Sequence, residues 1–182
     1  MPQHAVIAEN TEAPAPVLVL CDHATNRVPD CVNGGSLDIC ADDMNRHIAF
    51  DIGALGVSRH LANTLNAPLL ATNFSRLVID PNRGEDDPTL LMKLYDGTII
   101  PANRHADDSE KQRRLDAFHR PYHRAIAKRL DDWHTAGVTP AIISIHSFTP
   151  QLRGRALRPW KIGVLWDEDA RMARPLIDQL AA

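Results

Sequence analysis

Two short apolar segments constrain the fold of this chain more than any other feature of its sequence. They are VLVLC at residues 17–21 and AIISI at residues 141–145. Strands that lie in the middle of a parallel sheet have this composition, because helices cover both of their faces. We therefore predict that both segments are buried core strands of a parallel sheet.

Segments of helical periodicity separate the predicted strands. Helical segments are expected over residues 45–65, after a capping residue near Ser109, and from about Glu168 onward. A further helix is expected to carry Pro121 in its first turn and to continue to Trp133. Further short strands are expected at residues 68–71, 77–79 and 162–166, and a long loop at residues 84–108. Strands that alternate with helices predict an α/β protein, a three-layer α/β/α sandwich with a mainly parallel or mixed central sheet.

The chain is expected to contain one domain preceded by an arm. Residues 1–16 are rich in Ala, Pro and polar side chains, which is typical of a flexible N-terminal arm. Residues 17–182 are then long enough for a single α/β domain with a substantial core.

Composition favours a small molecule as the partner. The chain has 20 basic and 23 acidic side chains and a formal charge of −3, so no overall field attracts nucleic acid or an acidic membrane. No apolar run approaches the roughly 20 residues of a membrane span, and the N-terminus lacks the pattern of a signal peptide. We expect a cytoplasmic protein with no nucleic acid or membrane partner, and leave open whether it is a monomer or a homo-oligomer.

Two predicted strands end in a histidine. VLVLC is followed directly by Asp22 and His23, and AIISI by His146 and Ser147. In open α/β sheets ligands bind outside the carboxyl ends of the strands. We therefore expect both imidazoles at one edge of the sheet, where a site can form.

Asp51 is the predicted third member of this site. On a helix beginning near Asn45 it flanks the apolar stripe and faces the sheet. Two imidazoles and one carboxylate form the three-ligand set of catalytic zinc, which keeps a fourth position open. The alternatives are that the histidines are structural, and that His47 replaces Asp51 as the ligand.

A second group of polar residues surrounds the predicted strand at residues 77–79. Arg76, Asn82 and Arg83 suit recognition of a carboxylate, which predicts a small acidic substrate. The alternative is that Arg83 pairs with Asp80 or Glu85 in a tight turn. Further candidates for substrate binding lie in the loop after residue 150, namely Arg153, Arg155 and Arg158.

Covalent catalysis is disfavoured at two nucleophiles. Cys21 ends an apolar strand, where a thiol is usually an inert core residue. Ser147 has no flanking glycines of a nucleophile elbow. The three cysteines are odd in number and match no zinc-ribbon spacing, so we expect reduced thiols.

Seven sequence blocks, in order, resemble the N-formylglutamate amidohydrolase family. They are LVLCDHATNRVPD ending at residue 30, NRHIAFDIGA (45–54), SRLVIDPNRGEDDPT (75–89), DGTIIPAN (96–103), PYHRAI (121–126), IISIHSFTP (142–150) and RPWKIGVLW (158–166). The resemblance implies a phosphorylase/hydrolase-like fold, similar to that of zinc exopeptidases.

The resemblance also implies roles for single residues. His23 and His146 match the imidazole ligands of zinc, and Asp51 matches a carboxylate ligand of cell-wall amidases. In carboxypeptidases the carboxylate comes three residues after the first histidine, where this chain has Asn26. Asn82 and Arg83 resemble the pair with which carboxypeptidases hold a substrate carboxylate.

The expected activity is zinc-dependent hydrolysis of N-formyl-L-glutamate to formate and L-glutamate. Asp22, His23 and His146 are the expected catalytic residues, with Asp22 orienting His23. Family members generally continue past residue 182 into a strand similar to the one that carries the general base, so the domain is expected to be truncated or to use another base. The alternatives are a zinc amidase or carboxypeptidase acting on peptide or peptidoglycan-like substrates, and a non-catalytic protein that binds an acidic metabolite.

Overall fold

The computed structural model describes residues 5–181, which divide into two compact units, one ending at Phe148 and the other beginning at Thr149. The first unit holds a four-stranded sheet of β1 (Val6–Glu9), β2 (Val17–Cys21), β3 (Leu69–Thr72) and β6 (Ala141–Ser144). Its main helices are α2 (Ala54–Leu65), α4 (Asp108–Arg114) and α5 (Arg120–Thr135). Shorter elements are η1 (Asn33–Gly35), α1 (Ala41–Met44), α3 (Pro101–Arg104) and the hairpin of β4 (Leu94–Tyr95) and β5 (Thr98–Ile99).

The sheet is mixed, with strand order β1-β3-β2-β6. β2 pairs in parallel with both β3 and β6, whereas β1 runs antiparallel to β3. The predicted α/β fold with a mainly parallel or mixed sheet is confirmed.

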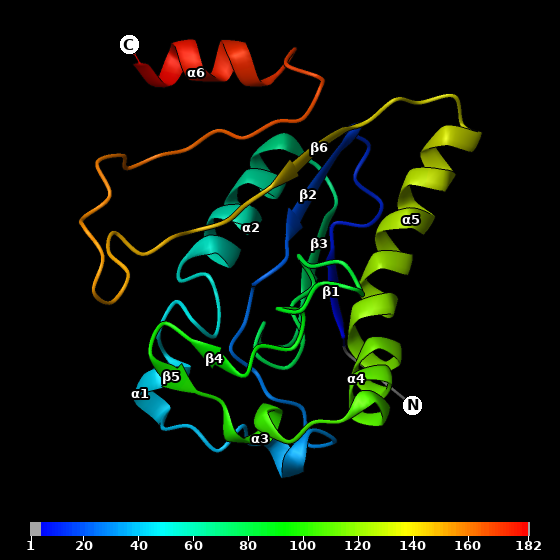
Figure 1. The fold of residues 1–182 in the computed structure, drawn as a ribbon. Coiled ribbons are helices and arrows are strands. Elements are labelled where there is room, and N and C mark those ends of the chain that lie inside the picture. Colours follow the sequence, from blue (N-terminus) through cyan, green and yellow to red (C-terminus); the bar gives the residue numbers. More distant parts are fainter. Residues whose placement is uncertain (1–4, 182) are drawn as a thin grey trace. The chain divides into compact units, whose positions relative to one another are not determined.

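Helices cover both faces of this sheet, as Figure 1 shows for α2 and α5. Alternate residues of a strand point to opposite faces. Val19 and Cys21 pack in a cluster with Ala54 and Ala62, whereas Leu18 and Leu20 pack in a cluster with residues of α5. The continuous apolar run of β2 therefore fills the space between two helix layers.

The first strand lies in a segment for which the sequence predicted an arm. Val6–Glu9 forms β1 and pairs with the whole of β3. Ile7 and Val6 pack against different core clusters of the first unit. The structure therefore has a strand where the sequence predicted an arm. Val6, Ile7 and Ala8 are three successive apolar residues, and such a run can pair with the edge of a strand even when its neighbours are polar.

The helix predicted over residues 45–65 is shorter than expected. Residues 45–50 form turns, and α2 begins only at Ala54, after Gly53 with φ of 81°. A left-handed residue cannot continue an α-helix, and glycine adopts that conformation without strain. Asp51 therefore lies just before the helix, not on it.

Residues 77–79 are buried but do not form the predicted strand. They lie in turns and irregular backbone of the loop after β3 and belong to the same apolar cluster as Ile48 and Leu90. A short apolar run indicates that its residues are buried, but buried residues do not have to form a strand.

The segment predicted after Ser109 and the helix predicted to begin at Pro121 follow each other without a break. Asp107, not Ser109, caps α4, because its side chain accepts a hydrogen bond from the Glu110 amide. A five-residue π-helix, η2 (Leu115–His119), then joins α4 to α5, and a proline stands in the first turn of α5 as expected.

β6 lies at an edge of the sheet, so its side chains alternate between partly buried and exposed instead of being enclosed as predicted. The second unit contains α6 (Ala173–Ala181), which begins after residue 168. Residues 162–166, predicted to be a strand, are irregular and largely exposed, with Leu165 at 92%. Among the helices of residues 5–181, none has the length and apolar composition needed to cross a membrane.

Candidate functional site

The two histidines at the strand ends lie side by side. β2 and β6 pair in parallel with Leu20 opposite Ser144, so both strands end at the same edge of the sheet. The rings of His23 and His146 have centroids 5.1 Å apart, in an edge-to-face arrangement. The parallel register therefore brings together two residues that are far apart in the sequence.

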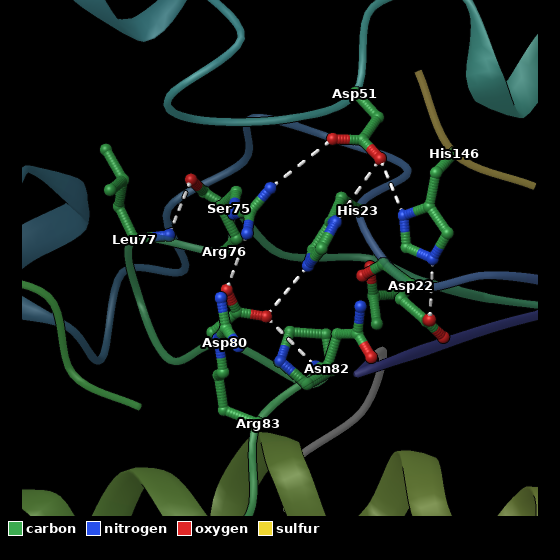
Figure 2. A network of polar contacts seen from close by, with 12 residues as sticks. Asp22, His23, Asp51, Ser75, Arg76, Leu77, Asp80, Asn82, Arg83 and His146 are labelled. Atoms are coloured by element: carbon green, nitrogen blue, oxygen red, sulfur yellow. Dashed lines mark hydrogen bonds and ion pairs between the residues drawn. The ribbon is translucent and has the colours of Figure 1, made fainter. Parts of the chain in front are cut away.

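Asp51 joins the two imidazoles. Its backbone amide donates to the His23 carbonyl at 2.9 Å, which fixes the turn that precedes α2 against the end of β2. Its Oδ2 atom lies 2.8 Å from Nδ1 of His146 and 3.3 Å from Nδ1 of His23. Figure 2 shows this carboxylate between the two rings.

The three side chains fit a divalent metal ion. One ligand atom from each of His23, Asp51 and His146 lies within 4.8 Å of the others. The opposite nitrogen of each ring faces a second carboxylate: Nε2 of His23 lies 2.8 Å from Asp80, and Nε2 of His146 lies 3.2 Å from Asp22. Metal-binding imidazoles are commonly held in this way, with one nitrogen on the ion and the other on a carboxylate. The residues can therefore hold a metal ion through two Nδ1 atoms and one carboxylate.

The same contacts shift the pKa values of the cluster. Hydrogen bonds with Asp22 and Asp51 raise the pKa of His146 to about 9. Burial acts to lower the pKa of His23, but hydrogen bonds with Asp51 and Asp80 raise it above its ordinary value. Burial acts to raise the pKa of Asp51, but hydrogen bonds from both rings hold it well below its usual range. The site is therefore built to stabilise positive charge between ionised carboxylates.

Arg76 and Asp80 support the His23 side of the cluster. Asp80 is fully buried, and its Oδ2 lies 2.8 Å from Nη2 of Arg76. Nη1 of Arg76 lies 3.5 Å from Oδ1 of Asp51. We expected Arg76 to bind a substrate carboxylate, but its guanidinium is held by the two carboxylates of the site itself (Figure 2).

Asp22 supports the His146 side, whereas we expected it to orient His23. Its Oδ1 accepts a hydrogen bond from the buried Tyr122 hydroxyl at 2.7 Å. Its Oδ2 faces Nε2 of His146 and accepts a hydrogen bond from the Ser144 hydroxyl at 3.3 Å. The reason is geometric: side chains of adjacent residues after a strand point in different directions, so Asp22 reaches the neighbouring strand instead of His23.

Asn82 and Arg83 lie in a turn directly after Asp80. The Asn82 amide donates to Oδ1 of Asp80 at 2.9 Å, the same oxygen that faces His23. Both side chains are exposed. The alternative pairing of Arg83 is not found among the described residues, because Asp80 pairs with Arg76 and Glu85 pairs with Arg120.

The remaining predicted residues lie outside the cluster. His47 faces Asp96 at 3.4 Å, and the Asn26 side chain donates to the Met44 carbonyl, so neither belongs to the metal-binding group. Arg155 is exposed in the second unit. Burial raises the pKa of the Cys21 thiol to about 11, as expected for an inert core cysteine.

Sequence reasoning missed the supporting residues Asp80 and Tyr122. Asp80 was considered only as an alternative partner of Arg83 in a tight turn, and Tyr122 was given no role in the site. A signal was available for Asp80, because it directly follows the apolar residues 77–79. An aspartate that is buried together with such a run needs a charged partner. No comparable signal marks Tyr122, whose hydroxyl reaches a residue one hundred positions away.

Comparisons with known proteins indicate one family. The model of the family described as N-formylglutamate amidohydrolase matches residues 15–182 of this chain. The N-formylglutamate deformylase of Pseudomonas putida is 29% identical over 130 residues, which are 64% of this chain and 45% of that protein. The match thus spans less than half the length of this curated relative.

A solved structure has the same fold. The crystal structure of a gene product from Agrobacterium tumefaciens is 34% identical to this chain and superposes on it with a TM-score of 0.92. The superposition covers 99% of this chain and 70% of that chain.

Proposed function

Because the chain belongs to the N-formylglutamate amidohydrolase family, we propose that it is a zinc-dependent hydrolase that converts N-formyl-L-glutamate and water to formate and L-glutamate. The observation that carries the proposal is the group of His23, Asp51 and His146, with a carboxylate behind each imidazole. A zinc ion held by these residues would act as a Lewis acid on the formyl carbonyl and would lower the pKa of a water molecule.

The protein's own residues would prepare this centre in two ways. Asp80 and Asp22 each keep a proton on Nε2 of one imidazole, which leaves both Nδ1 atoms available as ligands. Arg76 balances the charge of Asp80 and Asp51, so these two carboxylates can lie close together in a largely buried space.

Asn82 and Arg83 would recognise the acidic side of the substrate. Their exposed side chains follow Asp80, which contacts His23 directly. A guanidinium can bind a carboxylate through two parallel hydrogen bonds, and a neighbouring amide adds a neutral donor. This position would place the glutamate carboxylates beside the metal-binding group.

Metal analysis and formate release test the proposal together. Purified protein should contain about one zinc ion per chain and release formate from N-formyl-L-glutamate. The variant His146→Ala should lose both properties, since it removes one of the three residues that can hold the ion.

Two results would contradict the proposal. A metal-free wild type with full deformylase activity would exclude the metal mechanism. Calorimetric binding of N-formyl-L-glutamate by zinc-loaded protein without turnover would favour a non-catalytic metabolite-binding role.

A further inference from the structure

One short helical segment holds residues 78–85 of the loop that follows β3. The π-helix η2 and the residues on either side of it make four contacts to this loop. The contacts are Arg114 to the Val78 carbonyl at 2.9 Å, His119 to the Arg83 carbonyl at 2.9 Å, Arg120 to the Glu85 carboxylate at 2.6 Å and His123 to the Pro81 carbonyl at 3.0 Å.

The two histidine contacts differ from the others because they hold the backbone of the turn that carries Asn82 and Arg83. A carbonyl oxygen can only accept a hydrogen bond, so Nε2 of both His119 and His123 must carry the donating proton. One ring binds the residue before Asn82 and the other binds Arg83 itself. The turn is therefore held at both ends, while its two polar side chains remain exposed.

The rings of His119 and His123 also support each other. They are four residues apart, on one face of the helical segment, and their centroids lie 4.4 Å apart. His119 is buried, and its Nδ1 atom has no hydrogen-bond partner among the described residues. An unprotonated Nδ1 tolerates this environment better than a buried N–H would, and burial lowers the pKa of His119 accordingly.

The π-helix gives a reason for this placement. π-Helical turns are rare and are frequently found at functional sites. Here the turn ends at His119, directly before the helix that presents His123 to the Pro81 carbonyl and Tyr122 to Asp22. The start of α5 therefore contacts both sides of the site, through side chains that are not themselves candidate ligands.

We propose that His119 and His123 are positioning residues that fix the turn at residues 81–83, so that Asn82 and Arg83 are presented to a carboxylate of the substrate. The role of the two presented side chains rests on the proposed function. The two histidines act only through backbone carbonyl groups and do not contact the substrate themselves.

Paired substitutions test this proposal. Glutamine can place an amide N–H near the position of Nε2, whereas leucine fills similar space without a donor. In His119→Leu we expect KM for N-formyl-L-glutamate to rise about tenfold, and in His123→Leu about threefold, because His123 is more exposed. Zinc content and kcat should stay close to wild type, and His119→Gln and His123→Gln should restore most of the loss.

Hydrogen exchange supplies a readout that does not depend on the substrate. The amides of Asn82 and Arg83 are hydrogen-bonded to Asp80, so loosening of the turn should speed their exchange in the leucine variants. Arg120→Gln is the matched control, because it removes only side-chain ion pairs, one to Glu85 in the same loop and one to Asp116 in η2. It should leave both exchange and KM nearly unchanged.

The results separate this proposal from the proposed function. Unchanged exchange in the leucine variants, or equal behaviour of the glutamine and leucine variants, would overturn the positioning role. Faster exchange with an unchanged KM would show that the turn does not present residues to the substrate, and would overturn it as well. If the wild type releases no formate, the proposed function fails, while the exchange experiment still decides whether the turn is held. His123→Leu keeps the test available if His119→Leu does not fold.

Discussion

At the end of β2 the protein encloses His23, whereas at the end of β6 it leaves about a third of the His146 side chain, 35%, open to solvent. Both rings turn Nδ1 toward Asp51 and Nε2 toward a further carboxylate. The difference lies in the surroundings, since β2 is an inner strand and β6 is an edge strand. The inner strand fixes half of the site rigidly, and the edge strand provides the half that a ligand can approach.

One pair of facing residues tests the difference between the inner strand and the edge strand. Leu18 in β2 and Ile142 in β6 are opposite each other in the register, with 0% and 46% of their surfaces exposed. Leu18→Ala should lower the free energy of unfolding by about 3 kcal/mol, because it leaves a cavity between the sheet and α5. Ile142→Ala should cost less than about 1 kcal/mol. Urea unfolding of the two variants measures the difference, and equal losses would show that the edge strand is as well packed as the inner one.

The carboxylates behind the two imidazoles, Asp80 and Asp22, should differ in their effect on metal binding. In Asp80→Asn, an amide N–H replaces one of the two oxygens that face Arg76 and His23, and the side chain is fully buried, away from bulk solvent. In Asp22→Asn the corresponding mismatch faces the partly exposed His146. We expect zinc affinity to fall about a hundredfold for Asp80→Asn and about tenfold for Asp22→Asn.

Competition with a chelator of known zinc affinity measures both values. Losses of equal size, or a larger loss for Asp22→Asn, would contradict the distinction between the enclosed side and the open side. The far-ultraviolet circular dichroism of each variant serves as the control for correct folding.

The Tyr122 hydroxyl supports the carboxylate behind His146. Tyr122→Phe removes the hydrogen bond to Asp22 and leaves the buried ring in place. The free energy of unfolding should fall by about 1 kcal/mol, and zinc affinity should fall only a few-fold, because Asp22 keeps its contact with Ser144. Thermal unfolding with and without zinc checks both parts. A loss of zinc affinity as large as that of Asp80→Asn would mean that Tyr122 supports the whole cluster.

The inner part of the fold could be predicted from the sequence. β2, β3 and β6 were recognisable as apolar runs, and the positions of His23 and His146 followed from the rule that sites form at the carboxyl ends of parallel strands. These features depend on local composition and on general topology. Neither requires knowledge of which loops pack together.

Features that depend on loop packing could not be predicted. Asp51 was selected because it was thought to lie on a helix, yet a turn before Gly53 carries it to the two rings. The apolar residues 77–79 and 162–166 resemble strands in composition, but the first are buried in turns and the second have no strand partner among the described residues. Such outcomes depend on which segments meet in three dimensions, and a single sequence does not encode that as a local pattern.

The parallel pairing of β2 with β6 also determines when the site can form during synthesis. The Ser144 hydroxyl meets Asp22 across 122 positions of sequence, and His146 meets Asp51 across 95. Domains fold as the chain emerges from the ribosome at about 5–20 residues per second, and contacts between distant residues form late. The nascent chain therefore exposes His23 and Asp51 for several seconds before His146 has been made, and a complete set of ligands exists only once β6 has joined the sheet.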